Sequence, residues 1–497
     1  FAGPSMMDAV RRYNLFSGGG VAPPEWGLGF WYRAYGQGNA DEVIAIAQDL
    51  RDSKIPCDVL GLEPGWQSHS YSCSFQWDAE RFSNPRGFIE SAKRLGYRIN
   101  LWEHAFTHPS SPLFEKLLPY SADYGVFGGL VPDFAGAPAR TIFGEYHGKE
   151  LIDLGITGFK LDECDNSDYT GGWSFPEFTQ FPSGLDGEQM HQVFGLRYQD
   201  AILRQFEERQ KPTYNLVRSS GALAAPYPFV LYSDLYGHRE FVRALVNAGF
   251  SGLLWCPEVR DAENDEDLIR RLQTVIFSPL AMVNAWYIKN PPWKQIDSKK
   301  NNANDLSADW KTLESRCRSI IEWRMRLVPY LRGAFADYEL NGTPPFRALI
   351  MDDPEDESLL VVDDEYMMGD RILVAPLFAG EDARKVVLPK GAWHDFWSGQ
   401  AFQGGRTYTV PGSQENIPVF VKAGSILPLG GVGLTTGEQA GRQLTVLLFG
   451  DGSLPWKMGG PTGFEVRRSP SGKVEMHSTG IEPHDYQIAA IKHMSGV

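Results

Sequence analysis

Residues 159–165 of the chain read Phe159-Lys160-Leu161-Asp162-Glu163-Cys164-Asp165. A short apolar run that ends in carboxylates is typical of a buried parallel strand whose carboxyl end faces an active site. Seven similar runs occur on either side of it, so the chain has eight in all. They cover residues 26–35, 57–66, 97–106, 159–165, 213–220, 229–236, 251–259 and 278–286.

Segments with a helical pattern separate these runs. They include residues 40–52, 87–95, 188–210, 239–248 and 265–275. Eight alternations of strand and helix predict an α/β fold, a (β/α)8 TIM barrel. The alternative is an open, doubly wound sheet. It is weakened because no glycine-rich phosphate fingerprint opens a helix after the first strand.

The regions outside this alternation predict the remaining organisation. Residues 107–149 form a long connection rich in Gly, Pro and aromatic residues, which we expect to be a lid or a wall of the pocket. A long helical pattern covers residues 309–338, and short β-like runs follow it, among them 359–362, 371–377, 385–388, 408–410, 419–421 and 444–449. We therefore expect a catalytic barrel with its N-terminal lead-in over 1–340 and a proximal β-sandwich over 341–430. A distal β domain, whole or partial, is expected over 431–497.

Composition narrows the class of partner. The net charge is −15 over 497 residues, which disfavours binding to nucleic acid. No run of eighteen apolar residues occurs, so we expect no membrane span. A neutral substrate fits the acidic balance, and the 13% of aromatic residues supplies rings that stack on sugars, although most such rings belong to a core. The compartment and the oligomeric state stay open; the chain begins at Phe1 without a signal peptide, and a secreted or periplasmic location is slightly favoured.

Polar residues end many of the predicted strands, where a barrel places its chemistry. They are Glu63, Glu103, Asp162, Arg218, Asp234, Glu258 and Asn284. Several acids that converge on a pocket for a neutral substrate are what glycoside hydrolysis requires. His104 and His108 have no further ligand residues at a suitable spacing, so we expect no metal and no cofactor.

Strand alternation places Lys160 and Asp162 on one face and Glu163 on the other. A lysine at this position would keep Asp162 ionised, as a nucleophile must be. The alternative is a buried Lys–Asp pair that only fills the top of the barrel.

Asp234 lies between Tyr232 and Tyr236 on its own face. Partial burial among these rings would raise the pKa of its carboxyl group, which suits a general acid. Arg218 would orient the substrate or tune the acids, or it forms a structural salt bridge. Trp102 and Trp255 are candidate platforms for sugar stacking, although each alone is more often part of a core.

At this point the sequence resembles glycoside hydrolase family 31. The similarity runs nearly end to end, and its two most specific stretches are residues 388–399 and 417–426. The other matching stretches are residues 21–29, 55–59, 75–82, 325–331 and 342–344.

The resemblance implies a retaining enzyme for α-linked sugars, with an oligosaccharide or glycoside as its substrate. Carried over by position, Asp162 matches the nucleophile and Asp234 the acid/base, with carboxyl groups expected about 5–5.5 Å apart. Arg218 matches a sugar-binding arginine. Glu63, Glu258 and Asn284 fall on family positions that contact the sugar and usually hold Asp, Asp and His.

The departures from the usual pattern of the α-glucosidases in this family concern the sugar. Lys160-Leu161-Asp162-Glu163 replaces W-x-D-x, Tyr232-Ser233-Asp234 replaces W-x-G-D, and Met282 and Asn284 replace Arg and His. The resemblance is therefore nearer to a divergent, α-galactosidase-like branch, and we expect an exo-acting α-galactosidase. The alternatives are an α-glucosidase, α-xylosidase or α-N-acetylgalactosaminidase of the same family, a transglycosylase, or an inactive carbohydrate-binding homologue.

Overall fold

The computed structural model describes residues 1–164, 173–234, 237–256, 258–413 and 415–494. Its centre is a seven-stranded parallel sheet in the order β8-β7-β6-β3-β2-β1-β9. In chain order these strands are β1 (Phe30–Arg33), β2 (Val59–Leu62), β3 (Arg98–Glu103), β6 (Gly158–Leu161), β7 (Asn215–Val217), β8 (Phe229–Leu231) and β9 (Ala281–Asn284). Parallel bridges from Leu231 to Trp255 and from Val259 to Val283 join the two edges of the sheet through the segment around residues 254–259. The sheet is thereby closed into a barrel, as predicted.

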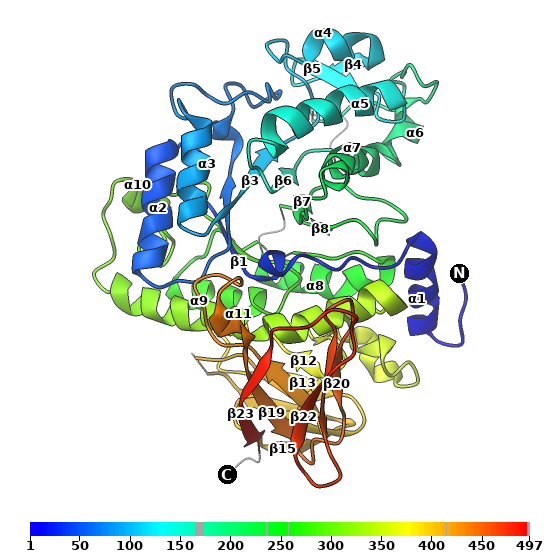
Figure 1. The fold of residues 1–497 in the computed structure, drawn as a ribbon, viewed down its shortest axis with the longest axis vertical. Coiled ribbons are helices and arrows are strands. Elements are labelled where there is room, and N and C mark those ends of the chain that lie inside the picture. Colours follow the sequence, from blue (N-terminus) through cyan, green and yellow to red (C-terminus); the bar gives the residue numbers. More distant parts are fainter. Residues whose placement is uncertain (165–172, 235–236, 257, 414, 495–497) are drawn as a thin grey trace.

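All eight predicted runs contribute to this barrel, and helices cover its outer surface (Figure 1). Asp165 and Tyr236, which end two of the predicted runs, lie outside the described residues. The covering helices are α2 (Ala40–Asp52), α3 (Pro85–Arg94), α5 (Ala137–Tyr146), α7 (Phe194–Glu208), α8 (His238–Ala248) and α9 (Asp265–Val275).

Helix α2 illustrates why these segments are helical. Asn39 accepts a hydrogen bond from the backbone N–H of Glu42, and the Glu42 side chain accepts one from the backbone of Asn39. This capping box satisfies two backbone donors that would otherwise have no partner in the first turn. Val43, Ala47 and Leu50 then share one buried face, which packs the helix against the barrel.

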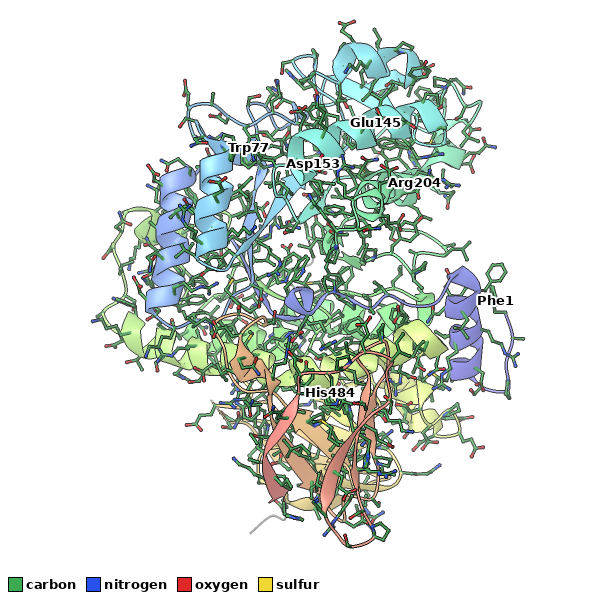
Figure 2. All side chains as sticks on the ribbon, viewed as in Figure 1. Phe1, Trp77, Glu145, Asp153, Arg204 and His484 are labelled. Carbon is green, nitrogen blue, oxygen red and sulfur yellow. The ribbon has the colours of Figure 1, made fainter. Side chains whose placement is uncertain are left out.

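The connection after β3 is more regular than predicted. Instead of an irregular loop, residues 114–146 contain α4 (Phe114–Leu117), the hairpin β4 (Ser121–Val126) and β5 (Gly129–Pro132), and α5. Phe127 and Gly128 turn the hairpin with positive φ angles. The insertion lies above the barrel with α5 beside α7 (Figure 1), and Figure 2 shows the side chains of Glu145 on α5 and Arg204 on α7.

Helix α11 (Trp310–Asn341) runs between the barrel and the C-terminal sheets (Figure 1). The largest of these sheets has the order β10-β11-β12-β17-β14-β15 and is antiparallel. Its strands are β10 (Phe346–Ala348), β11 (Tyr366–Met368), β12 (Ile372–Val374), β14 (Ala392–Asp395), β15 (Ala401–Gln403) and β17 (Val419–Lys422). Two further strands from the same part of the chain, β13 (Ala383–Leu388) and β16 (Arg406–Pro411), form a separate antiparallel pair.

Two three-stranded sheets complete the C-terminal region. One contains β18 (Ile426–Leu429), β19 (Gln443–Phe449) and β23 (Gln487–Met494), and the other β20 (Trp456–Met458), β21 (Phe464–Arg468) and β22 (Val474–Ser478). The run predicted as a strand at 359–362 is instead part of a 3-10 helix, η7 (Glu357–Val361). The domain limits at 340 and 430 stay predictions; β18, before residue 430, pairs with β19 after it.

Among the described residues, no helix combines the length and the apolar character that a membrane crossing would need.

Asp58 links the amino-terminal end of β2 to the C-terminal region. Its Oδ1 atom accepts hydrogen bonds from the backbone N–H (3.0 Å) and the hydroxyl (2.7 Å) of Thr436. Burial raises the pKa of the Asp58 carboxyl group to about 7, although the bonds from Thr436 act in the opposite direction. The ionised form is therefore disfavoured in the folded protein.

We predict that Asp58 makes the folded state less stable as the pH rises. Because its pKa is raised on folding, the native state binds a proton that the unfolded chain has lost, between about pH 4 and pH 7. Over this window the free energy of unfolding should fall by about 1.4 kcal/mol per pH unit relative to Asp58→Asn, which cannot ionise. Melting temperatures of both proteins from pH 4.5 to about 8 test this, and parallel curves would contradict it.

Candidate active site

The carboxyl end of β6 carries the residue at the centre of the site, Asp162. Its backbone N–H donates to the carbonyl of Glu103 at the end of β3 (2.8 Å), so the strand register fixes its position. The N–H of Arg218, directly after β7, donates to the carbonyl of Leu161 (2.9 Å). The neighbouring strand ends of the barrel thereby bring Asp162 and Arg218 together, as their positions in the sequence predicted.

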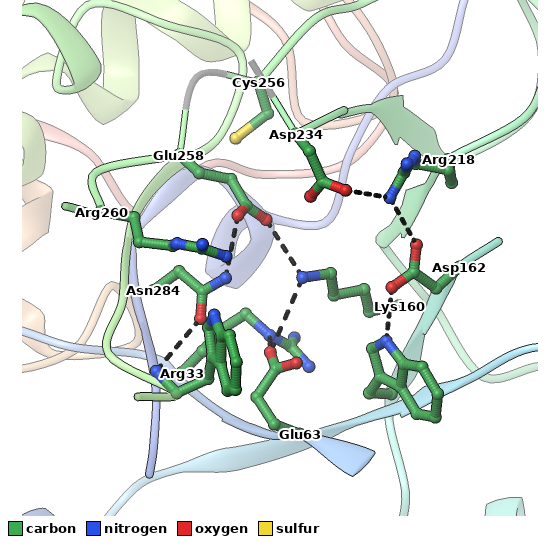
Figure 3. A network of polar contacts seen from close by, with 12 residues as sticks. Arg33, Glu63, Lys160, Asp162, Arg218, Asp234, Cys256, Glu258, Arg260 and Asn284 are labelled. Atoms are coloured by element: carbon green, nitrogen blue, oxygen red, sulfur yellow. Dashed lines mark hydrogen bonds and ion pairs between the residues drawn. The ribbon is translucent and has the colours of Figure 1, made fainter. Parts of the chain in front are cut away.

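Several donors and cations hold the carboxylate of Asp162. The indole Nε1 of Trp102 donates to Oδ2 (2.6 Å). On the other side, Nη1 of Arg218 donates to Oδ1 (3.2 Å), as Figure 3 shows. Burial alone would raise the pKa of this carboxyl group. The positive charges of Lys160 and Arg218, together with side-chain hydrogen bonds such as that from Trp102, outweigh burial and leave the pKa of Asp162 below its ordinary value. The ionised form that a nucleophile needs is thus favoured at neutral pH.

Arg218 also contacts the second acid. Its Nη1 atom lies 2.8 Å from Oδ2 of Asp234 and 3.2 Å from Oδ1 of Asp162 (Figure 3). These two oxygens are therefore at most about 6 Å apart, which is below the range of about 6.5–9.5 Å that accompanies inversion. The separation favours a retaining geometry.

The surroundings of Asp234 differ from the prediction. Its side chain is 54% exposed and is paired with a cation, instead of being mostly buried, and Tyr236, one of the two predicted rings, lies outside the described residues. Tyr232 is buried, and its ring faces the ammonium group of Lys160 at 4.5 Å. Residue 234 follows the end of β8, and its side chain therefore opens toward solvent instead of following the alternation of the strand.

A chain of alternating charges occupies the other side of the site (Figure 3). Lys160 lies 3.2 Å from Oε1 of Glu258 and 3.8 Å from Oε1 of Glu63. Glu258 accepts a hydrogen bond from Nδ2 of Asn284 (2.9 Å), and Glu63 accepts one from Nε of Arg33. The ion partners of Lys160 are thus the two glutamates, and the alternative of a buried Lys–Asp pair is not what the structure shows. Lys160 acts on Asp162 through its charge, which favours the ionised carboxylate as predicted.

The protonation of Lys160 follows from these contacts. Burial lowers the pKa of its ammonium group, but Glu258 and Glu63 outweigh burial, so that the pKa is raised. Lys160 consequently stays charged, and its positive charge compensates two buried carboxylates.

The two tryptophans predicted to stack on a sugar are both buried. Trp102 is 1% exposed and presents its N–H to Asp162, and Trp255 is 7% exposed. Neither has an open face on which a sugar could lie in this structure. Sequence alone could not decide whether a tryptophan at the end of a strand is a platform for sugar stacking or a buried hydrogen-bond donor.

Sequence reasoning missed Arg33, at the end of β1. Besides Glu63, its guanidinium group binds Oδ1 of Asn100 (2.6 Å) and the carbonyl of Leu62 (3.0 Å). A Cβ atom on Gly61 would lie only 2.6 Å from Nη1 of Arg33, so the glycine makes room for this side chain. An arginine within an otherwise apolar strand was the signal, because a buried guanidinium requires partners.

No group of three or more His, Cys, Asp or Glu side chains suited to a metal ion occurs in the part of the chain that the structure describes. His104 is buried beside the site, and burial lowers its pKa to about 3, against the opposing influence of Asp162. Its imidazole is therefore neutral at physiological pH.

Two family models match the chain and together cover most of it. Residues 20–334 match the family described as "Glycosyl hydrolases family 31 TIM-barrel domain". Residues 342–427 match "Glycosyl hydrolase family 31 C-terminal domain".

Curated relatives show the same similarity at low identity. The chain is 26% identical to "Alpha-glucosidase 2" of Bacillus thermoamyloliquefaciens, over 88% of this chain and 57% of that protein. It is 23% identical to "Alpha-xylosidase" of Emericella nidulans, over 86% of this chain and 56% of that protein. The chain thus spans little more than half the length of these relatives.

Solved structures share the fold. A GH31 α-xylosidase from Xanthomonas citri superposes with a TM-score of 0.85 at 18% identity, covering 100% of this chain and 59% of that one. A GH31 dextranase of Flavobacterium johnsoniae, complexed with glucose, has a TM-score of 0.82 at 21% identity, covering 97% of this chain and 64% of that one.

Proposed function

The chain belongs to glycoside hydrolase family 31, and from this premise we propose that it is a retaining α-glycoside hydrolase that uses Asp162 as nucleophile and Asp234 as general acid/base. The observation that carries the proposal is the position of Arg218 between the two carboxylates. Their separation lies below the range of about 6.5–9.5 Å that accommodates a water between the base and the sugar in an inverting enzyme, which supports retention.

The first step forms a covalent intermediate. A carboxylate oxygen of Asp162 attacks the anomeric carbon, and the bond from that carbon to the glycosidic oxygen breaks. Asp234, protonated at this stage, gives its proton to the departing oxygen. The products are a glycosyl ester on Asp162 and the free alcohol. Before attack, the indole N–H of Trp102 orients the carboxylate by its hydrogen bond to Oδ2.

The second step reverses the roles. Asp234, now a carboxylate, takes a proton from water, and the hydroxide oxygen bonds to the anomeric carbon while the ester bond to Asp162 breaks. The half-exposed position of Asp234 supports this role, because solvent can reach it. Two displacements at the same carbon leave the configuration unchanged.

The buried charge network supports a role in sugar recognition. Glu63, Lys160, Glu258 and Asn284 form one polar network, whose Lys160 acts on Asp162 through its charge, and they carry both donors and acceptors for sugar hydroxyl groups. Each of these groups already has a partner within the protein. A sugar hydroxyl of the wrong configuration would disturb such a contact without replacing it, and would leave a buried polar group without a hydrogen bond.

We propose an α-galactoside as the preferred substrate, resting on Glu63, Glu258 and Asn284 in place of the usual Asp, Asp and His. The two curated relatives compared above are named for glucosidase and xylosidase activity, and glucosides and xylosides are therefore the competing substrates to test.

A panel of aryl α-glycosides tests this specificity. We expect the galactoside to have the highest kcat/KM, because a site built for one hydroxyl epimer can discriminate by up to about 10⁴-fold. Asn284→His should lower kcat/KM for the galactoside by about 10–100-fold, because Glu258 loses its amide donor and the buried position must hold a larger ring.

Asn247→His places the same substitution on the exposed side of α8 and serves as the control. A wild-type preference for the glucoside, the xyloside or the N-acetylgalactosaminide would overturn the galactoside assignment, while leaving hydrolysis itself intact.

A further inference from the structure

The backbone directly after Asp162 has an unusual conformation. Glu163 has a φ angle of 59°, in the left-handed region that non-glycine residues rarely occupy. The N–H of Cys164 donates to the carbonyl of Asp162 (3.2 Å), which closes a three-residue turn around Glu163. A γ-turn with a positive central φ is strained, and strained backbone that persists is held by its surroundings.

This turn directs a donor at Asp162. The backbone N–H of Glu163 lies 2.8 Å from Oδ1 of the Asp162 side chain and donates to it. The same oxygen accepts from Arg218, while Oδ2 accepts from Trp102. The proposed nucleophile is therefore fixed by one backbone donor, whose direction depends on the conformation of Glu163, and two side-chain donors.

Tyr71 anchors Glu163 from the opposite side. The Glu163 residue is 6% exposed, and its Oε1 atom accepts a hydrogen bond from the hydroxyl of Tyr71 (2.9 Å). Tyr71 lies in the connection that follows β2, far from Glu163 in sequence. Its ring also packs against Trp102, with centroids 5.3 Å apart. Tyr71 thus contacts two of the three groups that support Asp162.

We propose that Tyr71 and Glu163 form a positioning pair, in which the hydroxyl of Tyr71 holds the Glu163 turn so that its N–H stays directed at the carboxylate of Asp162. Both side chains are assigned a positioning role, because the contact with the nucleophile that they support is made by the backbone N–H of Glu163. The inference rests on the proposed function of Asp162, and it adds two residues that the sequence-based assignment of the site left out.

Loss of the pair should change the pH profile if the pair positions Asp162, and only the thermal stability if the pair serves folding alone. If the turn relaxes, Asp162 loses a donor to its ionised form, and its protonation in the free enzyme should become easier. The lower limb of the pH profile of kcat/KM then moves to higher pH. A role in folding alone would lower thermal stability and leave this limb in place. The ionisable side chains around Asp162 are Lys160, Arg218, Tyr71, His104, Tyr232 and Glu163, with Asp234 on the other side of Arg218, and only Tyr71 and Glu163 are replaced. Removal of a negative charge at Glu163 would by itself favour the ionised form of Asp162, so it acts against the expected shift of the limb to higher pH.

The experiment compares four variants with wild type in kcat, KM and pH profile on an aryl α-glycoside that the wild type cleaves. We expect Tyr71→Phe and Glu163→Ala each to lower kcat by about 10–100-fold and to raise the lower apparent pKa by about one unit. Glu163→Gln retains an acceptor for Tyr71 and should recover most of the kcat of wild type. The double variant Tyr71→Phe/Glu163→Ala should have a kcat no lower than that of the less active single variant, because the losses from two residues that act as a unit do not add.

Tyr124→Phe removes the hydroxyl of another exposed tyrosine, in β4, and is the matched control. An unchanged lower limb in both Tyr71→Phe and Glu163→Ala, or additive losses in the double variant, overturns the positioning pair. If Glu163→Ala does not fold, Tyr71→Phe against Glu163→Gln gives the same decision. Failure of the wild type to cleave any glycoside of the panel would instead overturn the proposed function.

Discussion

Replacing Asp162 by alanine should abolish turnover on every glycoside that the wild type cleaves. The expected loss in kcat is on the order of 10⁴-fold or more, because no covalent intermediate can form without the attacking carboxylate. The loss should not depend on the leaving group, since the attacking atom is missing from the first step. Steady-state rates on an activated aryl glycoside and on an unactivated alkyl glycoside measure this.

Two further variants make the result specific. Asp162→Asn keeps the size of the side chain and should be nearly as inactive, which excludes a simple effect of lost volume. Asp153→Ala removes an acid whose side chain is 48% exposed and paired with Arg209 (Figure 2 labels it). Asp153 precedes β6, whereas Asp162 follows the opposite end of that strand, so this variant should keep wild-type rates. Turnover by Asp162→Asn within about tenfold of wild type would be incompatible with a nucleophilic role.

Replacing Asp234 by alanine should produce a loss that depends on the leaving group. For an alkyl glycoside, whose oxygen must be protonated to depart, kcat/KM should fall by about 10²–10⁴-fold. For an aryl glycoside with a good leaving group, kcat/KM should change by less than about tenfold, although kcat should fall because water then lacks its base.

Added azide gives a control within the same variant. Azide is an anion and needs no general base, so it should restore kcat of Asp234→Ala on the activated substrate by reacting with the glycosyl ester. It should not restore Asp162→Ala to the same retained product. Equal losses of kcat/KM on both classes of leaving group would give Asp234 another role, such as holding Arg218.

The barrel could be predicted from sequence because its pattern is local. Each strand is a short apolar run, and β6 shows the rule most clearly, with four buried residues followed directly by Asp162. Strand ends in a parallel barrel meet at one rim, so that the proximity of Asp162, Arg218 and Asp234 follows from chain order alone.

The features that could not be predicted depend on side chains from distant strands. Lys160 binds Glu63 and Glu258 across the barrel, and no local pattern shows that these partners are nearer to it than Asp162. The exposure of Asp234 depends on where β8 ends, and strand ends are poorly defined by periodicity. Residues 359–362 looked like a strand because they are apolar, yet Leu360 and Val361 are exposed in a short helical turn.

The network around Lys160 also explains why carboxylates can be buried at this rim. Arg33, Lys160 and Asn284 supply donors to Glu63 and Glu258, which would otherwise be strongly disfavoured in a buried position. Asp162 feels the charge of Lys160 and also contacts Arg218, which in turn contacts Asp234. The charge network and the proposed catalytic pair thus meet at Asp162.

The configuration of the first sugar released by the wild type tests the central claim most directly. Proton NMR spectra recorded within the first minutes of hydrolysis of an α-glycoside resolve the two anomers before they interconvert. Double displacement through Asp162 predicts that the α-anomer appears first and the β-anomer follows only by mutarotation. Initial release of the β-anomer would mean a single displacement and would contradict the assignment of Asp162 as a covalent nucleophile.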